Sequence, residues 1–556
     1  MEAGAALVEA LIDAGLDTAF TVPGESFLPV LEAMRRHRNR IQLVSVRQEG
    51  GGAFAAHAYG ALSGRPAAIM VSRGPGAANA SIGLHAALQD SVPMVLLIGH
   101  VRSHMRGREA FQEIDPASMF ASMSKAVLQP ERAEDVADAA REAVRLSLAG
   151  RPGPVVLVVP RDFGEIEVTA PPEKGVIKPQ PVIAGLEEIA ALAAAVQSAK
   201  RPLILAGELA RSPEARVALE AFAEASGAPV LAAYRCQDVM ANTHAAYAGH
   251  LEINPVAYQD QALAEADLIV VAGSRLDGIT SREEKLADNE AAMVLIHPDR
   301  AVQARFANSP AISKGRTLVA DVASTLTVAA GLLTDPPADR LTDLLTWREG
   351  LHDAFMRFSE PGGFQVHGAV DLAQVIAEAA AALPDDAVVA TDGGSYARWI
   401  HRYFRFRTGL TQGGTASGAM GAGVPGGIGA ALAKPGAPIV VFCGDGGFMM
   451  SGQELSTAAR EEIPIKVIVC DNDVHGSILK GQLDKYGEAA AYATRMGSPD
   501  FGQIARGYGV PAWRVEMTSQ WDTAFRAALA HEGPALVHVI CDARDIAPYG
   551  NGKDAV

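Results

Sequence analysis

The sequence has little cysteine and no long apolar run. Four cysteines occur among 556 residues, none of them in a Cys-x-x-Cys pair, and three lie in apolar, strand-like runs. They are typical of reduced core residues in a cytoplasmic protein. No apolar run reaches the length that crosses a membrane, and the first residues lack the basic segment of a signal peptide. We therefore expect a cytoplasmic protein without a membrane partner.

Positive charge is also scarce. The chain has 48 Lys and Arg against 64 Asp and Glu, a formal net charge of −16 at pH 7. This balance argues against nucleic acid or an anionic membrane as a partner. An anionic cofactor would have to be bound by a local device, such as a metal ion or the N-terminus of a helix.

The length is too great for a single core, and the residue pattern divides the chain into three units. Short apolar runs of strand length, such as Ala67–Val71, alternate with helical periodicity, which favours parallel sheets covered by helices. Pro-rich stretches at 171–181 and 336–337 separate the units. The sequence therefore predicts an α/β fold of three consecutive doubly wound parallel-sheet domains, at 1–170, 182–333 and 360–556.

The segment 438–473 places an acid and an amide at the ends of two successive strands. One apolar run ends in Gly444-Asp445-Gly446-Gly447, a helix-like run follows, and a second apolar run ends just before Asn472. In an open α/β sheet such carboxyl ends lie side by side, where these sheets bind ligands. Carboxylate, amide and carbonyl oxygens suit Mg²⁺, and the glycines allow the backbone to approach a diphosphate.

This segment resembles the signature of thiamin-diphosphate-dependent enzymes, in which Gly-Asp-Gly is followed, after a helix and a strand, by Asn. The resemblance implies thiamin diphosphate and Mg²⁺ as cofactors. It implies Asp445, Asn472 and the backbone carbonyl of Val474 as metal ligands. The further cofactor contacts that it implies are Gly24, Gly393, Gly394, Ser395, Gly444, Gly446, Gly447, Gly476, Ser477 and Ile478.

A second motif of the same family lies in the first unit. Glu49 follows a strand and precedes a helix rich in Gly and Ala, and on its own it reads as a carboxylate favoured by the helix dipole. By the resemblance, Glu49 hydrogen-bonds N1′ of the cofactor pyrimidine and favours the 4′-imino tautomer, which removes the C2 proton. The first unit would thus be the pyrimidine-binding domain, and the third the diphosphate-binding domain.

The glycine-rich stretch 413–430 reads as a loop that enters a helix. By the resemblance, the carbonyl of Gly418 accepts from the 4′-amino group, and Met420 props the cofactor into a bent shape. Met420 could equally fill the core, as Met usually does.

Several segments narrow the resemblance to the acetolactate synthase large-subunit branch, above all Glu109–Asp115. The likeness implies that Phe111 and Gln112 reach the active site and that the site lies between two subunits of a homodimer or homotetramer. It also implies decarboxylation of a 2-oxo acid followed by C–C bond formation with a carbonyl acceptor, the activity of a transferase or lyase.

The residues after Asn472 depart from that branch. Ser477 and Gly481 stand where it usually has Met and Trp, while Ile478 is retained. His475 and Lys480 are candidates for contacts with an acidic substrate, with His475 also counted among the catalytic residues, although solvation is the commoner state of such side chains. The alternative is therefore a thiamin-dependent lyase or decarboxylase of a different 2-oxo acid or a 2-hydroxy ketone.

The central unit gives equivocal signals. In flavin-containing members of the family it holds FAD, and Gly273–Asp277 loosely matches a segment that lies along the flavin. The stretch Ala206–Arg211 lacks the denser glycine pattern, so we do not favour tightly bound FAD. A rival reading from another class is a catalytically silent α/β protein that binds a nucleotide through its glycine loops.

Overall fold

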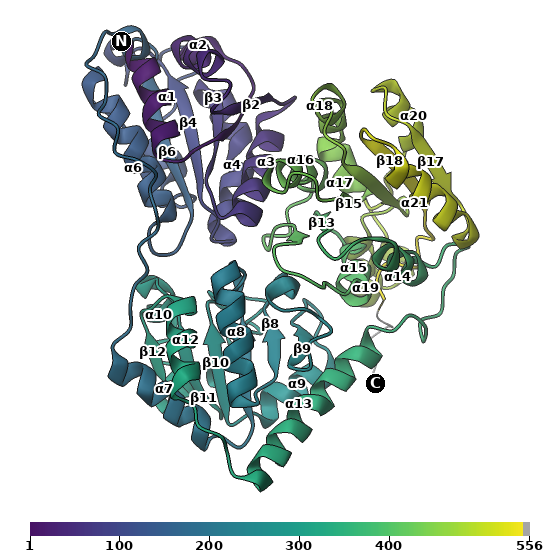
Figure 1. The fold of residues 1–556 in the computed structure, drawn as a ribbon. Coiled ribbons are helices and arrows are strands. Elements are labelled where there is room, and N and C mark those ends of the chain that lie inside the picture. The colour runs from purple at the N-terminus through teal and green to yellow at the C-terminus, as the bar shows by residue number, and fades with distance from the viewer. Residues whose placement is uncertain (549–556) are drawn as a thin grey trace.

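The computed structural model describes residues 1–548 and consists of three α/β units, each built on a six-stranded parallel sheet with helices packed against it (Figure 1). The predicted fold class, three consecutive doubly wound parallel sheets, is confirmed. The domain boundaries at 1–170, 182–333 and 360–556 stay a prediction. The first and third units lie side by side, and the central unit lies below both in Figure 1.

The strands and main helices of each unit are as follows. The first unit contains β1 (Thr18–Thr21), β2 (Gln42–Ser45), β3 (Ala67–Ser72), β4 (Met94–His100), β5 (Ala126–Leu128), β6 (Pro154–Pro160), α1 (Ala3–Asp13), α2 (Leu28–Arg36), α3 (Glu49–Ser63), α4 (Arg73–Gln89), α5 (Pro116–Phe120) and α6 (Val136–Leu148). The central unit contains β7 (Pro202–Ala206), β8 (Val230–Ala232), β9 (Tyr247–His250), β10 (Leu268–Ala272), β11 (Ala292–Ile296), β12 (Arg316–Leu318), α7 (Leu186–Ser198), α8 (Pro213–Ser226), α9 (Ala257–Glu265), α10 (Arg300–Phe306), α11 (Pro310–Lys314) and α12 (Val322–Leu332).

The long helix α13 (Ala338–Phe358) leads from the central unit to the third. The third unit contains β13 (Val388–Thr391), β14 (Gln412–Gly413), β15 (Ile439–Gly444), β16 (Lys466–Asp471), β17 (Ala512–Val515), β18 (Ala535–Ile540), α14 (Leu372–Ala382), α15 (Ala397–Tyr403), α16 (Gly423–Ala433), α17 (Asp445–Ser451), α18 (Leu455–Arg460), α19 (Gly476–Tyr486), α20 (Phe501–Gly507) and α21 (Trp521–Ala530).

The first and third sheets share one topology. Their strand orders, β2-β1-β3-β4-β6-β5 and β14-β13-β15-β16-β18-β17, follow the same plan, with the direction of winding reversing after the first strand. The central sheet, β12-β11-β10-β7-β8-β9, has instead the order of a dinucleotide-binding fold read from its far end. The first and third units are thus two versions of one architecture, and the central unit is a different one.

Small residues join the first and third units. A Cβ atom on Gly429 of α16 would lie 2.0 Å from the carbonyl oxygen of Ala55 on α3, so only glycine permits this approach. On the other side of α3, a Cβ on Gly83 of α4 would lie 2.4 Å from the Cβ of Ala53. One apolar cluster runs without interruption from the first sheet into the third, so the two units share a core.

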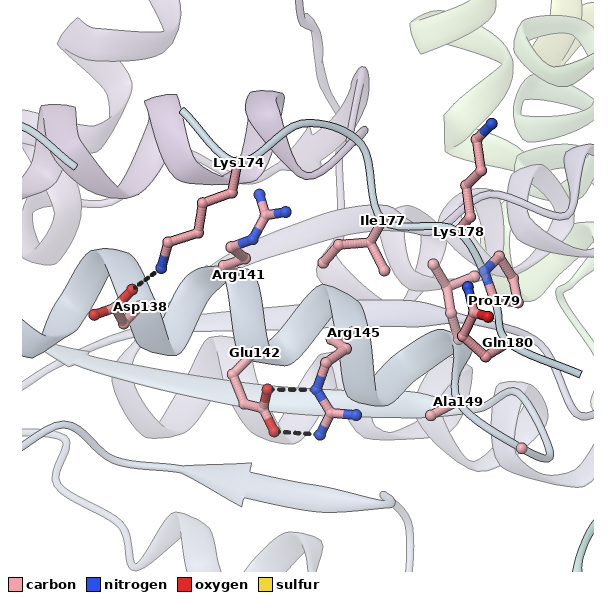
Figure 2. Close-up of a pocket in the computed structure, with 12 residues that line it drawn as sticks. Asp138, Arg141, Glu142, Arg145, Ala149, Lys174, Ile177, Lys178, Pro179 and Gln180 are labelled. Carbon is pink, nitrogen blue, oxygen red and sulfur yellow. Dashed lines mark hydrogen bonds and ion pairs between the residues drawn. The ribbon is translucent and has the colours of Figure 1, made fainter. Parts of the chain in front are cut away.

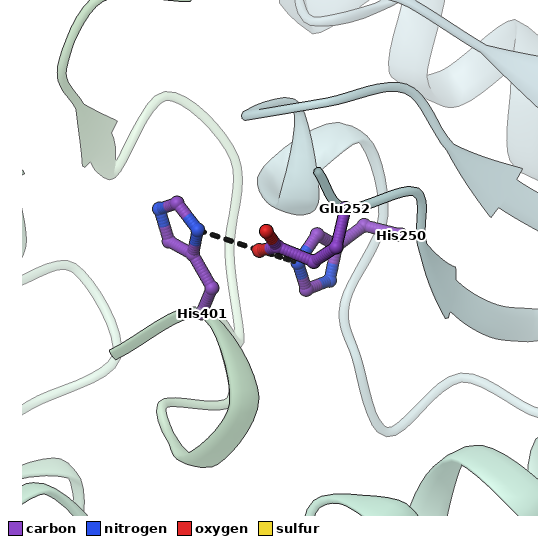
Figure 3. Close-up of side chains that lie close together, drawn as sticks. All are labelled: His250, Glu252 and His401. Carbon is purple, nitrogen blue, oxygen red and sulfur yellow. Dashed lines mark hydrogen bonds and ion pairs between the residues drawn. The ribbon is translucent and has the colours of Figure 1, made fainter. Parts of the chain in front are cut away.

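Buried polar groups join the central unit to the third. His250, at the end of β9, and His401, on α15, both hydrogen-bond one carboxylate oxygen of Glu252, at 2.8 and 2.6 Å (Figure 3). All three residues are almost fully buried. A second buried pair, Arg211 and Asp238, closes the same interface, because Asp238 also accepts from backbone N–H groups of the third unit.

The three side chains of Figure 3 offer two nitrogen atoms and one oxygen atom within 4.8 Å of one another, a donor set that some metal ions accept. Their separations of 2.6 and 2.8 Å are those of hydrogen bonds, which account for the arrangement by themselves. Burial raises the pKa of Glu252, but His401 and His250 outweigh it and hold that pKa well below its usual range. Burial lowers the pKa of His401.

No helix within residues 1–548 is long and apolar enough to cross a membrane. All four cysteines are free, three of them buried and Cys541 partly so.

We expect Glu252→Gln to weaken the junction between the central and third units. The Gln oxygen can still accept from both imidazoles but carries no charge, so the unfolding free energy should fall by roughly 1–1.5 kcal/mol for each hydrogen bond that loses its charge assistance. Urea unfolding at pH 7.5 measures this, with Glu290→Gln as the control because that side chain is 95% exposed in the same unit. An unchanged midpoint for Glu252→Gln would contradict the role of this carboxylate.

The same cluster predicts acid sensitivity. The pKa values of Glu252 and His401 both lie below their ordinary values in the folded state. The unfolded chain therefore binds more protons than the folded chain as the pH drops below about 6.5, the ordinary pKa of His, and stability is lost in that direction.

Candidate active site

The candidate site of the third unit begins at the reversal of its sheet, between β13 and β15. The residue after β13, Asp392, is fully buried. Its carboxylate accepts from the Tyr396 hydroxyl at 2.5 Å and from the N–H of Gly421 at 3.1 Å. Burial raises the pKa of Asp392 to about 6. A Cβ on Gly447 would lie 1.8 Å from the Asp392 carboxylate, so this glycine has a packing role independent of any cofactor.

Gly393 and the loop before α16 lie against each other. Gly393 donates its N–H to the carbonyl of Ala419 at 3.0 Å, and a Cβ on Gly393 would lie 1.9 Å from the carbonyl oxygen of Gly418. Gly418 has a φ of 67° and is exposed, with no atom within 4 Å of the position of a Cβ. The loop therefore keeps open space beside Gly418.

Asp445 opens α17 at the end of β15 and is buried. Its carboxylate accepts from the N–H of Gly446 at 2.8 Å and from the Ser498 hydroxyl at 3.3 Å. Burial, together with the neighbouring Asp471, raises the pKa of Asp445 to about 7. Burial also acts to raise the pKa of Asp471. Hydrogen bonds, led by the one from His538, outweigh burial and lower the pKa of Asp471. Two carboxylates thus lie together at this edge of the sheet.

The loop after β16 is fixed by the segment 494–498. Asp473 has a φ of 58°, and its carboxylate accepts from the N–H of Ser498 at 2.8 Å, while His475 donates its N–H to the carbonyl of Thr494 at 2.8 Å. A Cβ on Gly476 would lie 2.5 Å from the Ser395 hydroxyl and 3.6 Å from the Asn472 amide nitrogen. The structure thus brings together three predicted cofactor contacts from three different elements.

Met420 and His475 converge over Gly446. A Cβ on Gly446 would lie 2.9 Å from the terminal methyl of Met420 and 3.3 Å from Cε1 of His475. The residues after His475 form helix α19, and Ser477 and Ile478 lie exposed in its first turn. His475 is therefore held at a helix N-terminus beside the glycines of α17.

The N-terminal candidates lie at the carboxyl edge of the first sheet. Glu49 opens α3, where the Gln48 side chain accepts from the N–H of Gly51. The Glu49 carboxylate accepts from the Asn79 amide at 2.9 Å. Gly24 packs tightly on Ser72, since a Cβ there would lie 2.4 Å from the Ser72 Cβ.

Phe111 and Gln112 lie along the same edge. Gln112, with a φ of 63°, accepts at its carbonyl from the N–H of Gly74 at 2.9 Å. Phe111 is 76% exposed, and its ring lies 5.8 Å from the Arg73 guanidinium. Both residues therefore flank the loop that follows β3.

Within one chain these two groups of residues lie apart. The loop that carries Gly418 and Met420 is anchored where Ala416 donates its N–H to Asp90, at the C-terminal end of α4. Glu49 is tied to Asn79, in the N-terminal half of that helix. The two anchor points, Asn79 and Asp90, are separated by about 16 Å at the rise of an α-helix.

Two cavities lie away from these candidate sites. A cavity of about 610 Å³ lies between α6 and the segment 174–180 (Figure 2). Its charged side chains are largely paired with one another, Asp138 with Lys174 and Glu142 with Arg145. Another, of about 950 Å³, lies where the three units meet. Neither is lined by a predicted catalytic or metal-binding residue.

Sequence reasoning missed some of the side chains that shape these sites. Asp392, Asp471 and Glu454 are buried carboxylates, and Glu454 accepts from the N–H groups of Arg47 and Gln48 just before Glu49. Asp392 and Asp471 directly precede the predicted contacts Gly393 and Asn472 in the sequence, and that position was the signal that could have found them. Glu454 touches the first unit only through the fold, so no local pattern could have shown it.

The site and the fold together define an α/β enzyme that binds a diphosphate cofactor at the carboxyl ends of parallel strands. The chain belongs to the thiamin-diphosphate-dependent enzymes. Three models of that family match it: the N-terminal TPP binding domain of thiamine pyrophosphate enzymes at residues 1–119, the central domain at 189–328, and the C-terminal TPP binding domain at 392–539.

Relatives along nearly the whole chain are acetolactate synthases. The large subunit of acetolactate synthase isozyme 1 of Escherichia coli is 29% identical, over 97% of this chain and 94% of the relative. Acetolactate synthase 2 of Brassica napus, a chloroplastic protein, is 31% identical, over 97% of this chain and 85% of the relative. The chloroplastic acetolactate synthase of Arabidopsis thaliana is also 31% identical, with 96% and 80% covered.

Proposed function

We propose that the protein is a Mg²⁺- and thiamin-diphosphate-dependent carboligase that decarboxylates a 2-oxo acid and joins the remaining fragment to a second carbonyl compound. The observation that carries this proposal is the pair of sheets with one topology. One presents Glu49 at its carboxyl edge, and the other presents Asp445 and Asn472 at the same place. The names of the relatives, acetolactate synthases, support the carboligase reading.

In this proposal the third unit holds the diphosphate and its metal ion. Asp445, the amide of Asn472 and the carbonyl of Val474 would bind Mg²⁺, which prefers such oxygen ligands. A cation there would favour the charged form of Asp445, whose pKa burial otherwise raises to about 7. The diphosphate would lie along the glycine turns and the start of α19, at Gly393, Gly394, Ser395, Gly444, Gly446, Gly447, Gly476, Ser477 and Ile478.

The first unit would supply the groups that act on the pyrimidine and the substrate. When bound, thiamin diphosphate would supply a nucleophilic carbon for the substrate carbonyl and a cationic thiazolium ring that accepts the electron pair released with carbon dioxide. Glu49 would hold a proton at N1′ of the pyrimidine, with Gly24 beside the ring. Met420 and Gly418 would set the bend of the cofactor, and Phe111, Gln112 and His475 would line the substrate side.

A complete site requires a second copy of the chain. The residues that anchor Glu49 and the loop of Met420 are about 16 Å apart along α4, so the partner subunit would supply the missing half, in a dimer or a tetramer. Exposed apolar side chains beside both halves support this arrangement. They are Phe111 in the first unit and Met449, Met450 and Ile478 in the third, each more than half exposed. Cytoplasmic location and the lack of tightly bound FAD stay predictions.

Glu49→Gln tests the assigned acid. We expect the exchange of the C2 proton of bound cofactor to slow by at least about 100-fold, the scale of a lost general acid–base contribution, because Gln cannot share a proton with N1′. Binding of thiamin diphosphate should change little. Proton exchange is followed by NMR after acid quench in heavy water, with Glu142→Gln, on the surface of α6, as the matched control. Wild-type exchange in Glu49→Gln would contradict the assignment.

A panel of 2-oxo acids, each alone and with an aldehyde or a second 2-oxo acid, tests the reaction itself. Mass spectrometry of the products should show a new C–C bond, and pyruvate alone should give acetolactate if the preference resembles that of the relatives. Free aldehyde as the sole product would favour the alternative, a lyase or decarboxylase. That alternative is supported by Gly481, beside which α19 leaves open space where the acetolactate synthases usually have Trp.

A further inference from the structure

We propose that the carboxyl edge of the N-terminal sheet binds an anionic group of the substrate through Arg73, Arg106 and Arg161. Either the donor 2-oxo acid would then carry a second negative charge, or its carbonyl acceptor would carry one. This inference rests on the proposed function and narrows its substrate class.

The three arginines follow the strand ends at the centre of the sheet. Arg73 comes directly after β3 and Arg161 directly after β6, and the N–H of Arg161 donates to the carbonyl of His100 at the end of β4. Arg106 lies in the loop beyond β4, and both Arg106 and Arg73 are close enough to His100 to act on its pKa. The cluster therefore lies at the edge where open parallel sheets bind ligands, next to the reversal between β1 and β3.

Several N–H donors of these guanidinium groups have no hydrogen-bond acceptor in the described part of the chain. Within residues 1–548, Nε of Arg73, Nε and Nη2 of Arg106, and Nε of Arg161 are buried and lack a hydrogen-bond partner. Arg73 as a whole is only 8% exposed. A buried donor without an acceptor costs free energy, and for a charged group the cost is larger. Several such donors at one strand edge indicate an acceptor that is not part of the chain.

The nearby carboxylates do not fill this role. Glu113 accepts from the N–H groups of Gly107 and Ala110, and Asp162 accepts from the N–H and hydroxyl of Ser103. These hydrogen bonds hold the loop 102–113 in place.

Glu25 is the carboxylate that the arginines share. It lies 3.1 Å from Arg73 and 3.7 Å from Arg161, and its side chain is 63% exposed. One exposed carboxylate thus serves two guanidinium groups, and Arg106 forms no ion pair within the described part of the chain. An incoming carboxylate, sulfonate or phosphonate would supply the missing acceptors, since Arg binds planar and tetrahedral anions through several N–H groups at once.

His100 sets the polarity of the pocket. Burial lowers its pKa, and the charges of Arg106 and Arg73 act in the same direction. Its Nε2 lies 3.2 Å from the carbonyl of Ile114, to which it donates as a neutral ring. His100 therefore adds no charge of its own, and the arginines supply the positive charge that attracts the anion.

The pocket adjoins the groups proposed to face the substrate. Arg73 lies against the ring of Phe111, and the next residue, Gly74, donates its N–H to the carbonyl of Gln112. Gly24 packs on Ser72, the residue before Arg73. An anion held by Arg73 would therefore lie beside the expected substrate position, which favours a charge on the substrate itself over a distant effector.

The test compares charged and neutral substrates in the holoenzyme. In the donor arm, 2-oxoglutarate is compared with 2-oxopentanoate as sole substrate. In the acceptor arm, glyoxylate is compared with acetaldehyde, with pyruvate as donor. We expect Arg73→Gln to lower kcat/KM for the charged member of one arm by roughly 10-fold or more, mainly through KM, the scale of one charge-assisted hydrogen bond. The neutral member should be unaffected.

Two further variants separate recognition from folding. Arg73→Lys should keep part of the preference because the charge remains, and Arg102→Gln, an exposed neighbour outside the cluster, should behave as the wild type. Equal loss on charged and neutral substrates, or no preference in the wild type, would overturn the proposal.

A binding measurement covers the case in which no substrate is turned over. Calorimetry with the unreactive dianion glutarate, in the presence of thiamin diphosphate and Mg²⁺, should show binding to the wild type and at least 10-fold weaker binding to Arg73→Gln. Absent or equal binding would overturn the anion pocket. Failure of the proposed function would show separately, as a lack of turnover with every 2-oxo acid and a lack of C2 exchange.

Discussion

Parallel strands place all their carboxyl ends on one edge of a sheet, and the candidate site depends on this constraint twice. In the third unit it brings the turns after β13, β15 and β16 together, so that Asp445, Asn472 and the glycines meet although they are distant in sequence. In the first unit it gathers Glu49, the turn of Gly24 and the arginine cluster. In the proposed function, the same plan builds one half of the site for the diphosphate and metal ion and the other half for the pyrimidine and substrate.

The helix contact between the two units determines where these halves can meet. Gly429 and Ala55 allow α16 and α3 to touch backbone to backbone, and the shared apolar core fixes their orientation. Along α4, Asn79 and Asp90, which anchor Glu49 and the loop of Met420, are about 16 Å apart. The central unit is held to the third by buried polar groups, His250, Glu252 and His401 among them.

The sequence predicted the features that a local pattern of residues reveals. The alternation of strands and helices established the fold class, and the glycine turns placed the strand ends of the third unit. The edge strands β5, β9, β12, β14 and β17 span only two to four residues each and were not predicted. No helix was predicted after His475, where the structure has α19. The Glu252 cluster and the carboxylate of Glu454 connect distant segments, so only the fold reveals them.

The central claim is that one active site is assembled from two chains, and complementation tests it directly. Glu49→Gln and Asp445→Asn are each inactive by this account, and they are co-expressed with different affinity tags. Half of the randomly paired dimers should then carry one intact site of two, so that about one quarter of the wild-type activity returns. Activity should follow the doubly tagged fraction. If each chain held a complete site of its own, both partners would stay inactive and no activity would return.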